Sequence, residues 1–412
     1  MRVLLAMLGA RRRYLVPEVM EELGVLGCFV TDVFMGKVGW LRSAIALVAR
    51  WVRPKSVRAL LGRSSSRIAR ERIVAFQWLG IRYAIATHVG RGDARLFAAV
   101  NRRFCLKSLP HLRAIDVCWA YNGAARELFE AARAKGIRCV LEQVIAPRDD
   151  ELRELRQARE DWPQWDCAEE QARPATSDPL AAREQAEWRL AHMIVVGSRY
   201  VRDCLQRSGV PAGRCTIVPS GIDLERFQVG TEVRGGRPLR VLFVGQINLR
   251  KGVPYLLEAA RRLNTARIEL RLIGALQSRR ECLAPFAPWA WFSGPIPLAE
   301  MASYYQWADI VVVPSICEGS AMVTYEARGC GVPIIATANA GAFFSPGVDG
   351  LEIPVRDAEA IASVLDRLAR NRNELHGLRE GAIANRHALG RDAYRDRIRS
   401  VLEAVRGPQF HA

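Results

Sequence analysis

Two glutamates, eight residues apart, stand where a strand-like segment gives way to a helix-like one. The apolar run 310–313 ends at Pro314, and Glu318 follows in a short Gly-Ser loop. Glu326 comes about two turns further on, in a helix that we expect to begin near Ala321. Carboxylates at such a junction can accept hydrogen bonds from sugar hydroxyls. The spacing of the two glutamates alone is a weak indication of a binding site, and their position at the end of a strand strengthens it.

Two adjacent cations, Arg250 and Lys251, also lie just after a strand-like segment, the apolar run 239–244. Gly245 and Gln246 follow that segment directly, and a helix-like segment comes after Lys251. Parallel-sheet proteins bind ligands beyond the carboxyl ends of their strands, and a helix N-terminus attracts phosphate. Cations are unfavourable at a helix start unless an anion binds there, because that end of the helix dipole is positive. The pattern favours a diphosphate clamp over a solvated Arg-Lys pair.

The elements that must position these residues alternate between strand-like and helix-like, which predicts an α/β protein built on parallel sheets. The expected strands cover residues 3–7, 114–119, 137–141, 193–196, 239–244, 268–273, 310–313 and 333–336. The expected helices cover residues 17–23, 124–135, 253–263, 358–370 and 392–405. The highly charged segment 148–189 is expected to be helical and to cover the N-terminal domain, and Ser198 is expected to cap the next helix.

A segment rich in Gly and Pro, 228–238, separates two halves that each show this alternation. We therefore predict two Rossmann-like domains in series. The N-terminal domain covers 1–230 and the C-terminal domain covers 231–390. The final helix, within 391–412, is expected to pack back on the N-terminal domain.

The chain is strongly basic, with 60 Lys and Arg against 43 Asp and Glu in 412 residues, a net charge of +17. Much of this charge lies in 36–72, where Trp40 and Trp51 are interleaved with arginines. A basic helix carrying tryptophans suits a surface of anionic lipid headgroups. The alternative is a basic helix packed on its domain with its arginines in water. No recognition module or base-stacking aromatic pattern supports nucleic acid, so no nucleic-acid partner is expected.

Other classes of protein are excluded by composition. Half of the residues are apolar, which rules out wholesale disorder, and no run of about 18 apolar residues occurs. The apolar run 3–8 is too short for a signal-peptide core, so we expect a cytoplasmic protein, peripheral on the cytoplasmic face of the membrane if 36–72 binds lipid. The ten cysteines show neither Cys-x-x-Cys pairs nor zinc spacing, and no metal site is expected.

From about residue 198 to residue 370 the sequence resembles the family-4 (group 1) retaining glycosyltransferases. The resemblance rests on the pair Glu318 and Glu326, on the segment 242–252 that carries the two cations, and on 330–336 after the second glutamate. It implies the GT-B architecture, in which two Rossmann-like domains face each other across a cleft. The resemblance implies that 1–230 is the acceptor-side domain and that 231–390 is the nucleotide-sugar-binding domain.

The resemblance also implies roles for single residues. Glu318 contacts the donor sugar and Lys251 the diphosphate, so both are expected to be catalytic, and Glu326 binds the ribose. The other donor-binding positions that it implies are Gly319, Ser320, Ala321, Met322, Gly245, Gln246, Arg250, Ile296, Gly9 and Gln143. Gln246 stands where relatives carry a cation, so Arg250 or an arginine of the N-terminal domain is expected to supply the second charge. Gln143 is expected to replace the cleft histidine of many relatives.

The implied function is retaining transfer of a sugar from a UDP-, GDP- or ADP-sugar to a hydroxyl of a glycan, a lipid-linked acceptor or a small molecule. Cell-surface polysaccharide or glycolipid synthesis is the expected setting, without metal or cofactor. The alternatives are a GT-B epimerase or phosphorylase, an inactive sugar-nucleotide-binding protein and a basic nucleic-acid-binding protein. The phosphorylase needs a pyridoxal-phosphate lysine, for which the sequence has no motif.

Overall fold

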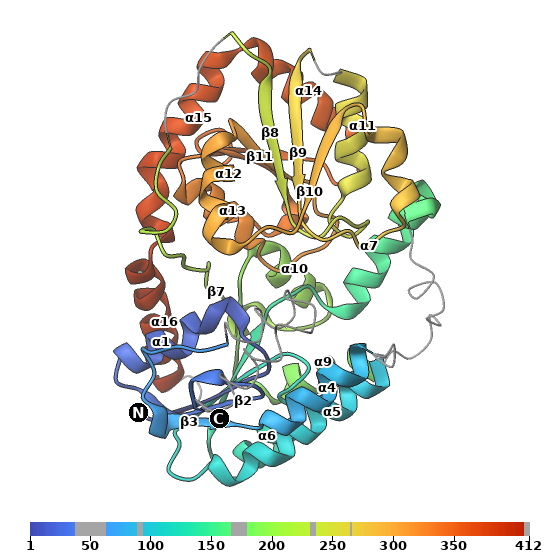
Figure 1. The fold of residues 1–412 in the computed structure, drawn as a ribbon. Coiled ribbons are helices and arrows are strands. Elements are labelled where there is room, and N and C mark those ends of the chain that lie inside the picture. The colour runs from blue at the N-terminus through green and yellow to red at the C-terminus, as the bar shows by residue number, and fades with distance from the viewer. Residues whose placement is uncertain (38–62, 89–93, 166–178, 231–235, 264–265, 408–412) are drawn as a thin grey trace.

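The computed structural model shows two α/β domains joined end to end, with the N-terminal domain below the C-terminal domain in Figure 1. It describes residues 1–37, 63–88, 94–165, 179–230, 236–263 and 266–407. Each domain is built on a parallel sheet with helices on both faces, which is the arrangement that buried apolar strands require.

The described part of the N-terminal domain contains a seven-stranded sheet in the order β3-β2-β1-β4-β5-β6-β7. Its strands are β1 (Val3–Met7), β2 (Leu26–Thr31), β3 (Ile73–Ala75), β4 (Val117–Tyr121), β5 (Arg138–Gln143), β6 (Met193–Val196) and β7 (Cys215–Ile217). Each pair of neighbours is parallel. The central strands β1 and β4 are buried on both faces, between two separate hydrophobic clusters.

The described part of the C-terminal domain contains a six-stranded parallel sheet in the order β10-β9-β8-β11-β12-β13. Its strands are β8 (Leu239–Val244), β9 (Ile268–Ile273), β10 (Ala290–Gly294), β11 (Ile310–Val313), β12 (Ile334–Thr337) and β13 (Gly350–Ile353). The chain order reverses between β8 and β11, so this sheet has a topological switch point there. Ligands of open α/β sheets bind beyond the strand ends at such a point.

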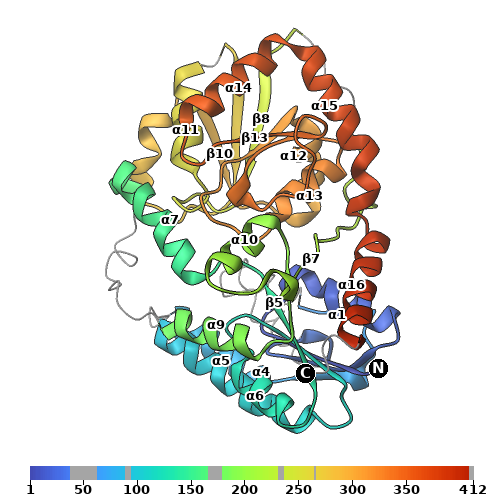
Figure 2. The same cartoon turned by 180° about the vertical axis from the view of Figure 1, so that it is seen from behind.

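Helices cover both sheets, as the two opposite views show (Figures 1 and 2). In the N-terminal half they are α1 (Leu15–Glu22), α4 (Gln77–His88), α5 (Ala94–Ser108), α6 (Arg126–Arg133), α7 (Arg148–Asp161), α9 (Pro179–Leu190) and α10 (Arg199–Arg207). In the C-terminal half they are α11 (Val253–Leu263), α12 (Met301–Trp307), α13 (Met322–Gly329), α14 (Ala358–Arg370), α15 (Arg372–Ala384) and α16 (Arg391–Arg406).

The sequence predicted the strongly apolar elements well and missed five strands. The strands over 193–196, 239–244, 268–273 and 310–313 and the helices over 253–263 and 358–370 have the expected bounds. The strand expected over 114–119 begins only at Val117. Strands β2, β3, β7, β10 and β13 were not anticipated. β3, β7 and β13 have only three or four residues, and β2 and β10 contain glycine, so their apolar pattern is weak.

The expectation that the whole charged segment 148–189 covers the N-terminal domain is wrong for the second half of α7. The first half does contact that domain, because the Arg148 amide donates to Glu184 on α9 at 2.9 Å and Asp150 pairs with Arg207 on α10 at 3.3 Å. Leu155 and Ala158 on this helix belong to the hydrophobic cluster of the C-terminal domain. The hydroxyl of Tyr255, on α11, donates to Asp161 at 2.5 Å. A helix that buries so few apolar side chains has no pattern that identifies the domain it packs against.

The last described helix, α16, lies beside α1 of the N-terminal domain in both views (Figures 1 and 2). Arg391 forms ion pairs with Glu18 at 2.9 Å and with Glu22 at 2.7 Å, both on α1. Tyr394 and Ile398 are fully buried in a hydrophobic cluster that also contains α1 and strands of the N-terminal sheet. The chain therefore crosses between the two domains a second time near its C-terminal end.

Most of the basic segment 36–72, namely 38–62, lies outside the described residues. In the described ranges, no helix combines the length and the apolar character that crossing a bilayer requires.

Candidate functional site

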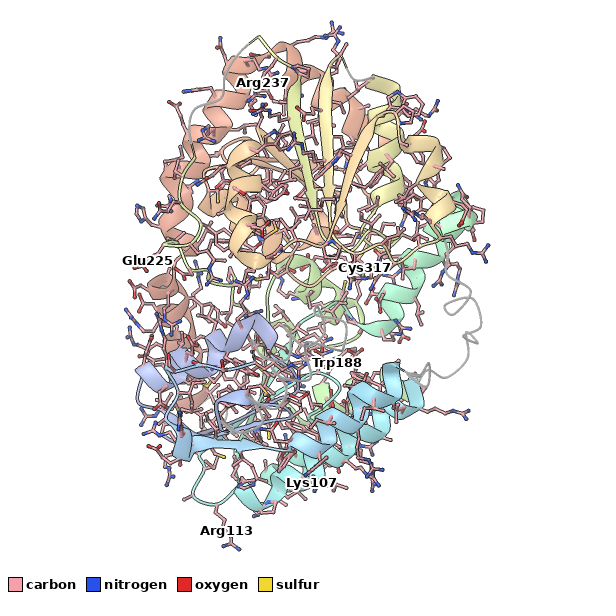
Figure 3. All side chains as sticks on the ribbon, in the orientation of Figure 1. Lys107, Arg113, Trp188, Glu225, Arg237 and Cys317 are labelled. Carbon is pink, nitrogen blue, oxygen red and sulfur yellow. The ribbon has the colours of Figure 1, made fainter. Side chains whose placement is uncertain are left out.

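The two domains meet through loops that follow their strands. Ser198, after β6, donates its hydroxyl to the carbonyl oxygen of Gly319 at 2.6 Å and caps α10 as expected. Val144, after β5, approaches so closely that a Cβ atom on Gly319 would lie 1.7 Å from its carbonyl oxygen. Only glycine at 319 allows this approach. Figure 3 shows nearby Cys317 at the level where the domains meet.

The turn after β8 is shaped by a second close approach. Gly252 has a φ of 67°, and a Cβ atom there would lie 1.9 Å from the carbonyl oxygen of Pro314. Its amide donates to the carbonyl oxygen of Leu249 at 2.8 Å, which closes the turn. This geometry brings Arg250 and Lys251 against the loop after β11.

Both cations converge on the first glutamate of the predicted pair. An Arg250 guanidinium nitrogen lies 2.5 Å from Glu318 Oε1, and the Lys251 ammonium contacts the same oxygen. Arg250 also donates to the carbonyl oxygen of Cys317 at 3.0 Å. Burial lowers the pKa of Lys251, and the charge of Glu318 opposes that shift. One carboxylate between two cations leaves excess positive charge, which suits an incoming phosphate.

The second glutamate, Glu326, lies on α13 and is buried. The Tyr305 hydroxyl, from α12, donates to its Oε2 at 2.8 Å. Arg13, from the N-terminal domain, places a guanidinium nitrogen 3.6 Å from its Oε1. Burial raises the pKa of Glu326, while the Tyr305 hydrogen bond and the Arg13 charge lower it. Side chains from both domains therefore contact Glu326. Neither Arg13 nor Tyr305 was assigned a role from the sequence.

The loop between the two glutamates holds four of the predicted donor-binding positions, Gly319, Ser320, Ala321 and Met322. Ser320 shares a hydrogen bond of 2.8 Å with the Tyr325 hydroxyl, and the Ala321 amide donates to the carbonyl oxygen of Ala340 at 3.1 Å. Ala321 is the N-cap of α13, and Met322 is its first residue. The loop is therefore fixed from both sides, with its backbone at a helix N-terminus.

In the N-terminal domain, Gly9 follows β1 with a φ of 78°. Its amide donates to Asp32 Oδ1 at 3.0 Å, and Arg63 binds the other carboxylate oxygen of Asp32 at 3.0 Å. Asp32 could not be singled out from the sequence, because the strand that it follows, β2, was not predicted. The structure makes this aspartate the anchor of the first loop.

Gln143 does not occupy the position expected for a sugar-binding side chain. It is fully buried, and its amide nitrogen donates to the Ile145 carbonyl oxygen at 3.0 Å and to Glu184 at 3.1 Å. Its amide oxygen accepts from Trp188 at 3.1 Å. These hydrogen bonds hold the Gln143 side chain inside the N-terminal domain. Two of its partners, Glu184 and Trp188, lie on α9, and the sequence could not show that α9 packs beside Gln143.

The remaining predicted positions lie around the ends of the C-terminal strands. Gly245, with a φ of 151°, directly follows β8 and donates its amide to the carbonyl oxygen of Ile273 at 2.9 Å. Gln246 is exposed, whereas Arg250 lies beside Lys251 at Glu318. Ile296 follows β10 and packs against the cluster that contains Tyr305.

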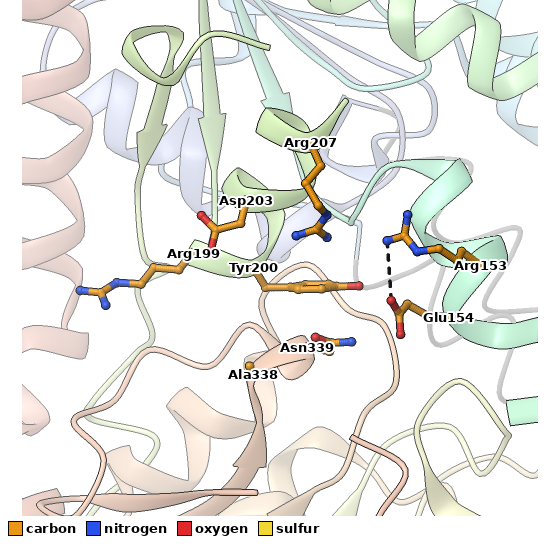
Figure 4. A pocket seen from close by; sticks show the side chains of 8 residues that line it. All are labelled: Arg153, Glu154, Arg199, Tyr200, Asp203, Arg207, Ala338 and Asn339. Carbon is orange, nitrogen blue, oxygen red and sulfur yellow. Dashed lines mark ion pairs between the residues drawn. The ribbon is translucent and has the colours of Figure 1, made fainter. Parts of the chain in front are cut away.

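A cavity of about 450 Å³ opens between the domains beside this site (Figure 4). It is lined by Arg153, Glu154, Arg199, Tyr200, Asp203, Arg207, Ala338 and Asn339. Its wall is shared with the loop after β11, because Asn339 accepts a hydrogen bond from the Glu318 amide at 3.0 Å and the Tyr200 hydroxyl lies 3.6 Å from Cys317 Sγ. No group of three metal-binding side chains occurs within the described ranges.

Comparison with known proteins identifies similar sequences for the part of the chain that carries this site. Residues 238–371, which include Lys251, Glu318 and Glu326, match the family of group 1 glycosyl transferases. The chain is 31% identical over 224 residues to the D-inositol 3-phosphate glycosyltransferase of Geodermatophilus obscurus, covering 47% of this chain and 50% of that protein. It is 32% identical over 232 residues to D-inositol 3-phosphate glycosyltransferase 1 of Catenulispora acidiphila, covering 48% and 54%. The chain thus spans about half the length of these curated relatives.

Solved structures share the fold of the whole chain. Sucrose-phosphate synthase of Thermosynechococcus elongatus superposes with a TM-score of 0.65 at 17% identity, covering 98% of both chains. Anabaena HepE in complex with UDP and glucose superposes with a TM-score of 0.62 at 11% identity, covering 98% of this chain and all of that one. The chain therefore has the GT-B fold, and its C-terminal half carries a group 1 glycosyltransferase domain.

Proposed function

We propose that this protein transfers a sugar from a nucleotide diphosphate sugar to an acceptor hydroxyl, with retention of the anomeric configuration, as a member of family 4. The observation that carries the proposal is the convergence of Arg250 and Lys251 on Glu318, with Glu326 eight residues further along the chain. HepE has been solved with UDP-glucose, which supports a UDP-sugar as donor, with GDP- and ADP-sugars as the alternatives.

The chemistry follows from charge. As the bond between sugar and phosphate breaks, positive charge grows at the anomeric centre and negative charge on the departing diphosphate. Arg250 and Lys251 stabilise the leaving group, and the backbone around Met322 supports its phosphates. Glu318 holds the donor sugar so that the anomeric carbon faces the acceptor. The departing phosphate accepts the proton of the acceptor hydroxyl, so no protein nucleophile and no metal ion is needed.

The acceptor reaches this carbon from the cavity between α7, α10 and residues 338–340. The Tyr200 ring and the planar polar groups of Arg207 and Asn339 suit a polar, hydroxyl-rich acceptor (Figure 4). A glycan, a lipid-linked sugar or a small polyol meets that description, with cell-surface polysaccharide or glycolipid synthesis as the setting.

We further propose a cytoplasmic protein that binds anionic membrane surfaces through 36–72. Described residues that follow this segment in the sequence support the idea. On α4, Trp78 and Ile85 are 78% and 59% exposed, and Arg82 lies on the same face of the helix. Exposed apolar and cationic side chains on one helix face suit a lipid interface.

A thermal-shift screen with UDP, GDP and ADP, alone and as sugar conjugates, tests the proposal first. A ligand that binds only the folded state raises the unfolding temperature. The selected sugar nucleotide is then incubated with an acceptor panel, and the anomeric configuration of the product is read by NMR. Stabilisation without turnover would favour an inactive sugar-nucleotide-binding protein, and an inverted product would contradict the retaining mechanism.

A further inference from the structure

An arginine from the N-terminal domain reaches the proposed ribose-binding glutamate of the C-terminal domain. Arg13 lies 3.6 Å from Glu326 Oε1, and its side chain is 53% exposed. This separation is longer than a hydrogen bond, so Oε1 retains the capacity to accept one from a hydroxyl. Oε2 is already occupied by Tyr305 at 2.8 Å. The contact leaves one carboxylate oxygen available and fixes the other.

The backbone that presents Arg13 is unusual. Arg12, Arg13 and Tyr14 have φ values of 45°, 52° and 67°, three consecutive left-handed residues, none of them glycine. This conformation is unfavourable for residues with a Cβ atom and persists only where the surroundings impose it. Such strain is often found at functional sites.

The flanking side chains hold the turn in place. Arg12 donates to the Tyr394 hydroxyl at 3.0 Å and lies 3.1 Å from the buried carboxylate of Glu142. The Tyr14 ring is buried against Phe29 and Phe34 at centroid distances of 5.8 and 5.3 Å. Packing on both sides thus forces Arg13 toward the C-terminal domain.

We propose that Arg13 is a positioning residue that aims the Glu326 carboxylate at the ribose hydroxyls and thereby links nucleotide binding to the approach of the two domains. The inference rests on the proposed function of Glu326. Glu326 and Tyr305 belong to the C-terminal domain, whereas Arg13 reaches them only when the domains are close. By thermodynamic linkage, a nucleotide that uses the positioned carboxylate favours the closed arrangement, and closure strengthens nucleotide binding.

The test measures binding of UDP, or of GDP or ADP where the screen selects it, by calorimetry. Arg13→Ala should weaken binding at least fivefold, and Arg13→Lys should restore part of the loss. In a Glu326→Gln background, Arg13→Ala should change the affinity less than twofold, because its target is gone. Arg226→Ala is the matched control. Arg226 is an exposed cation near Glu326, but it is next to Phe227, which packs in the hydrophobic core of the C-terminal domain. Its removal should change the affinity less than twofold.

Two further measurements separate positioning from a general structural effect. The groups around Glu326 are Arg13, Arg226, Tyr305 and Cys330, and the charge of Arg13 lowers the Glu326 pKa. In Arg13→Ala, UDP affinity should therefore begin to fall at a higher pH than in the wild type as the solution is acidified. Small-angle scattering should show compaction on UDP addition in the wild type and less of it in Arg13→Ala.

Each outcome decides the inference. Equal weakening by Arg13→Ala in both backgrounds, or an unchanged affinity, pH profile and compaction, overturns the positioning role and leaves the proposed function standing. Failure of the wild type to bind UDP, GDP or ADP overturns both.

Discussion

Gly252 and Pro314 lie so close that the Cβ atom of any other residue at 252 would stand 1.9 Å from the Pro314 carbonyl oxygen. This approach joins the turn after β8 to the end of β11. Because Lys251 precedes the glycine and Glu318 follows the proline by four residues, the same contact brings the ammonium to the carboxylate.

Gly252→Ala should destabilise the fold and the site together. A left-handed alanine costs about 1–2 kcal/mol, and the clash with backbone should raise the total to about 3 kcal/mol. Gly24→Ala is the matched control, because Gly24 has a φ of 68° and nothing within 4 Å of its Cβ position. It should cost only about 1 kcal/mol. Denaturant unfolding measures the free energy of unfolding of both variants. Equal losses of stability would contradict the close approach at Gly252.

Glu318→Ala should lower kcat by more than about tenfold, the effect of losing an interaction used in the transition state. It also leaves Arg250 and Lys251 without their shared carboxylate. Glu326→Ala should chiefly raise KM for the donor, because ribose binding is equal in ground and transition states. Steady-state kinetics with varied donor separates the two effects, and an unchanged kcat in Glu318→Ala would refute its role.

Lys251→Ala and Arg250→Ala should each lower kcat and raise the donor KM, because each removes charge that stabilises the leaving diphosphate. Lys251→Ala should cost more, because the ammonium is more enclosed than the guanidinium. Arg262→Ala, on the outer face of α11 where Arg262 pairs with Glu258 at 3.1 Å, provides a control that should leave both constants unchanged. If Arg250→Ala behaves like this control, Arg250 is not the second cation.

Activity should persist in EDTA, because cations and a helix N-terminus neutralise the leaving group in the proposed mechanism. The measurement is the transfer rate before and after exhaustive chelation. Loss of activity with EDTA that Mn²⁺ restores would show that the reaction needs a divalent metal.

Vesicles containing phosphatidylserine should retain the protein at low salt and release it as salt rises, because the attraction is screened. Trp78→Ser combined with Ile85→Ser should reduce retention severalfold. Val348→Ser changes another half-exposed apolar residue, in the C-terminal domain, and should leave retention unchanged. Equal sedimentation with acidic and neutral vesicles at low salt would refute the membrane proposal.

Features that depend on local pattern could be predicted from the amino-acid sequence. The strand bounds of β8, β9 and β11, the helix bounds of α11 and α14, and the placement of Lys251 and Glu318 at strand ends all follow from apolar runs and the residues that interrupt them. Parallel strands then bring those ends to one edge of a sheet, so the cations and the carboxylate could be expected to meet.

Contacts between distant parts of the chain, by contrast, follow from tertiary packing alone. Gln143 looks available in the sequence, yet Glu184 and Trp188 bury its amide. Arg13 looks like one of three equivalent arginines, yet a left-handed turn sends it across the domain boundary to Glu326. Sequence patterns report the local backbone and which face is buried, whereas these contacts depend on how separate elements pack, and no local periodicity encodes that.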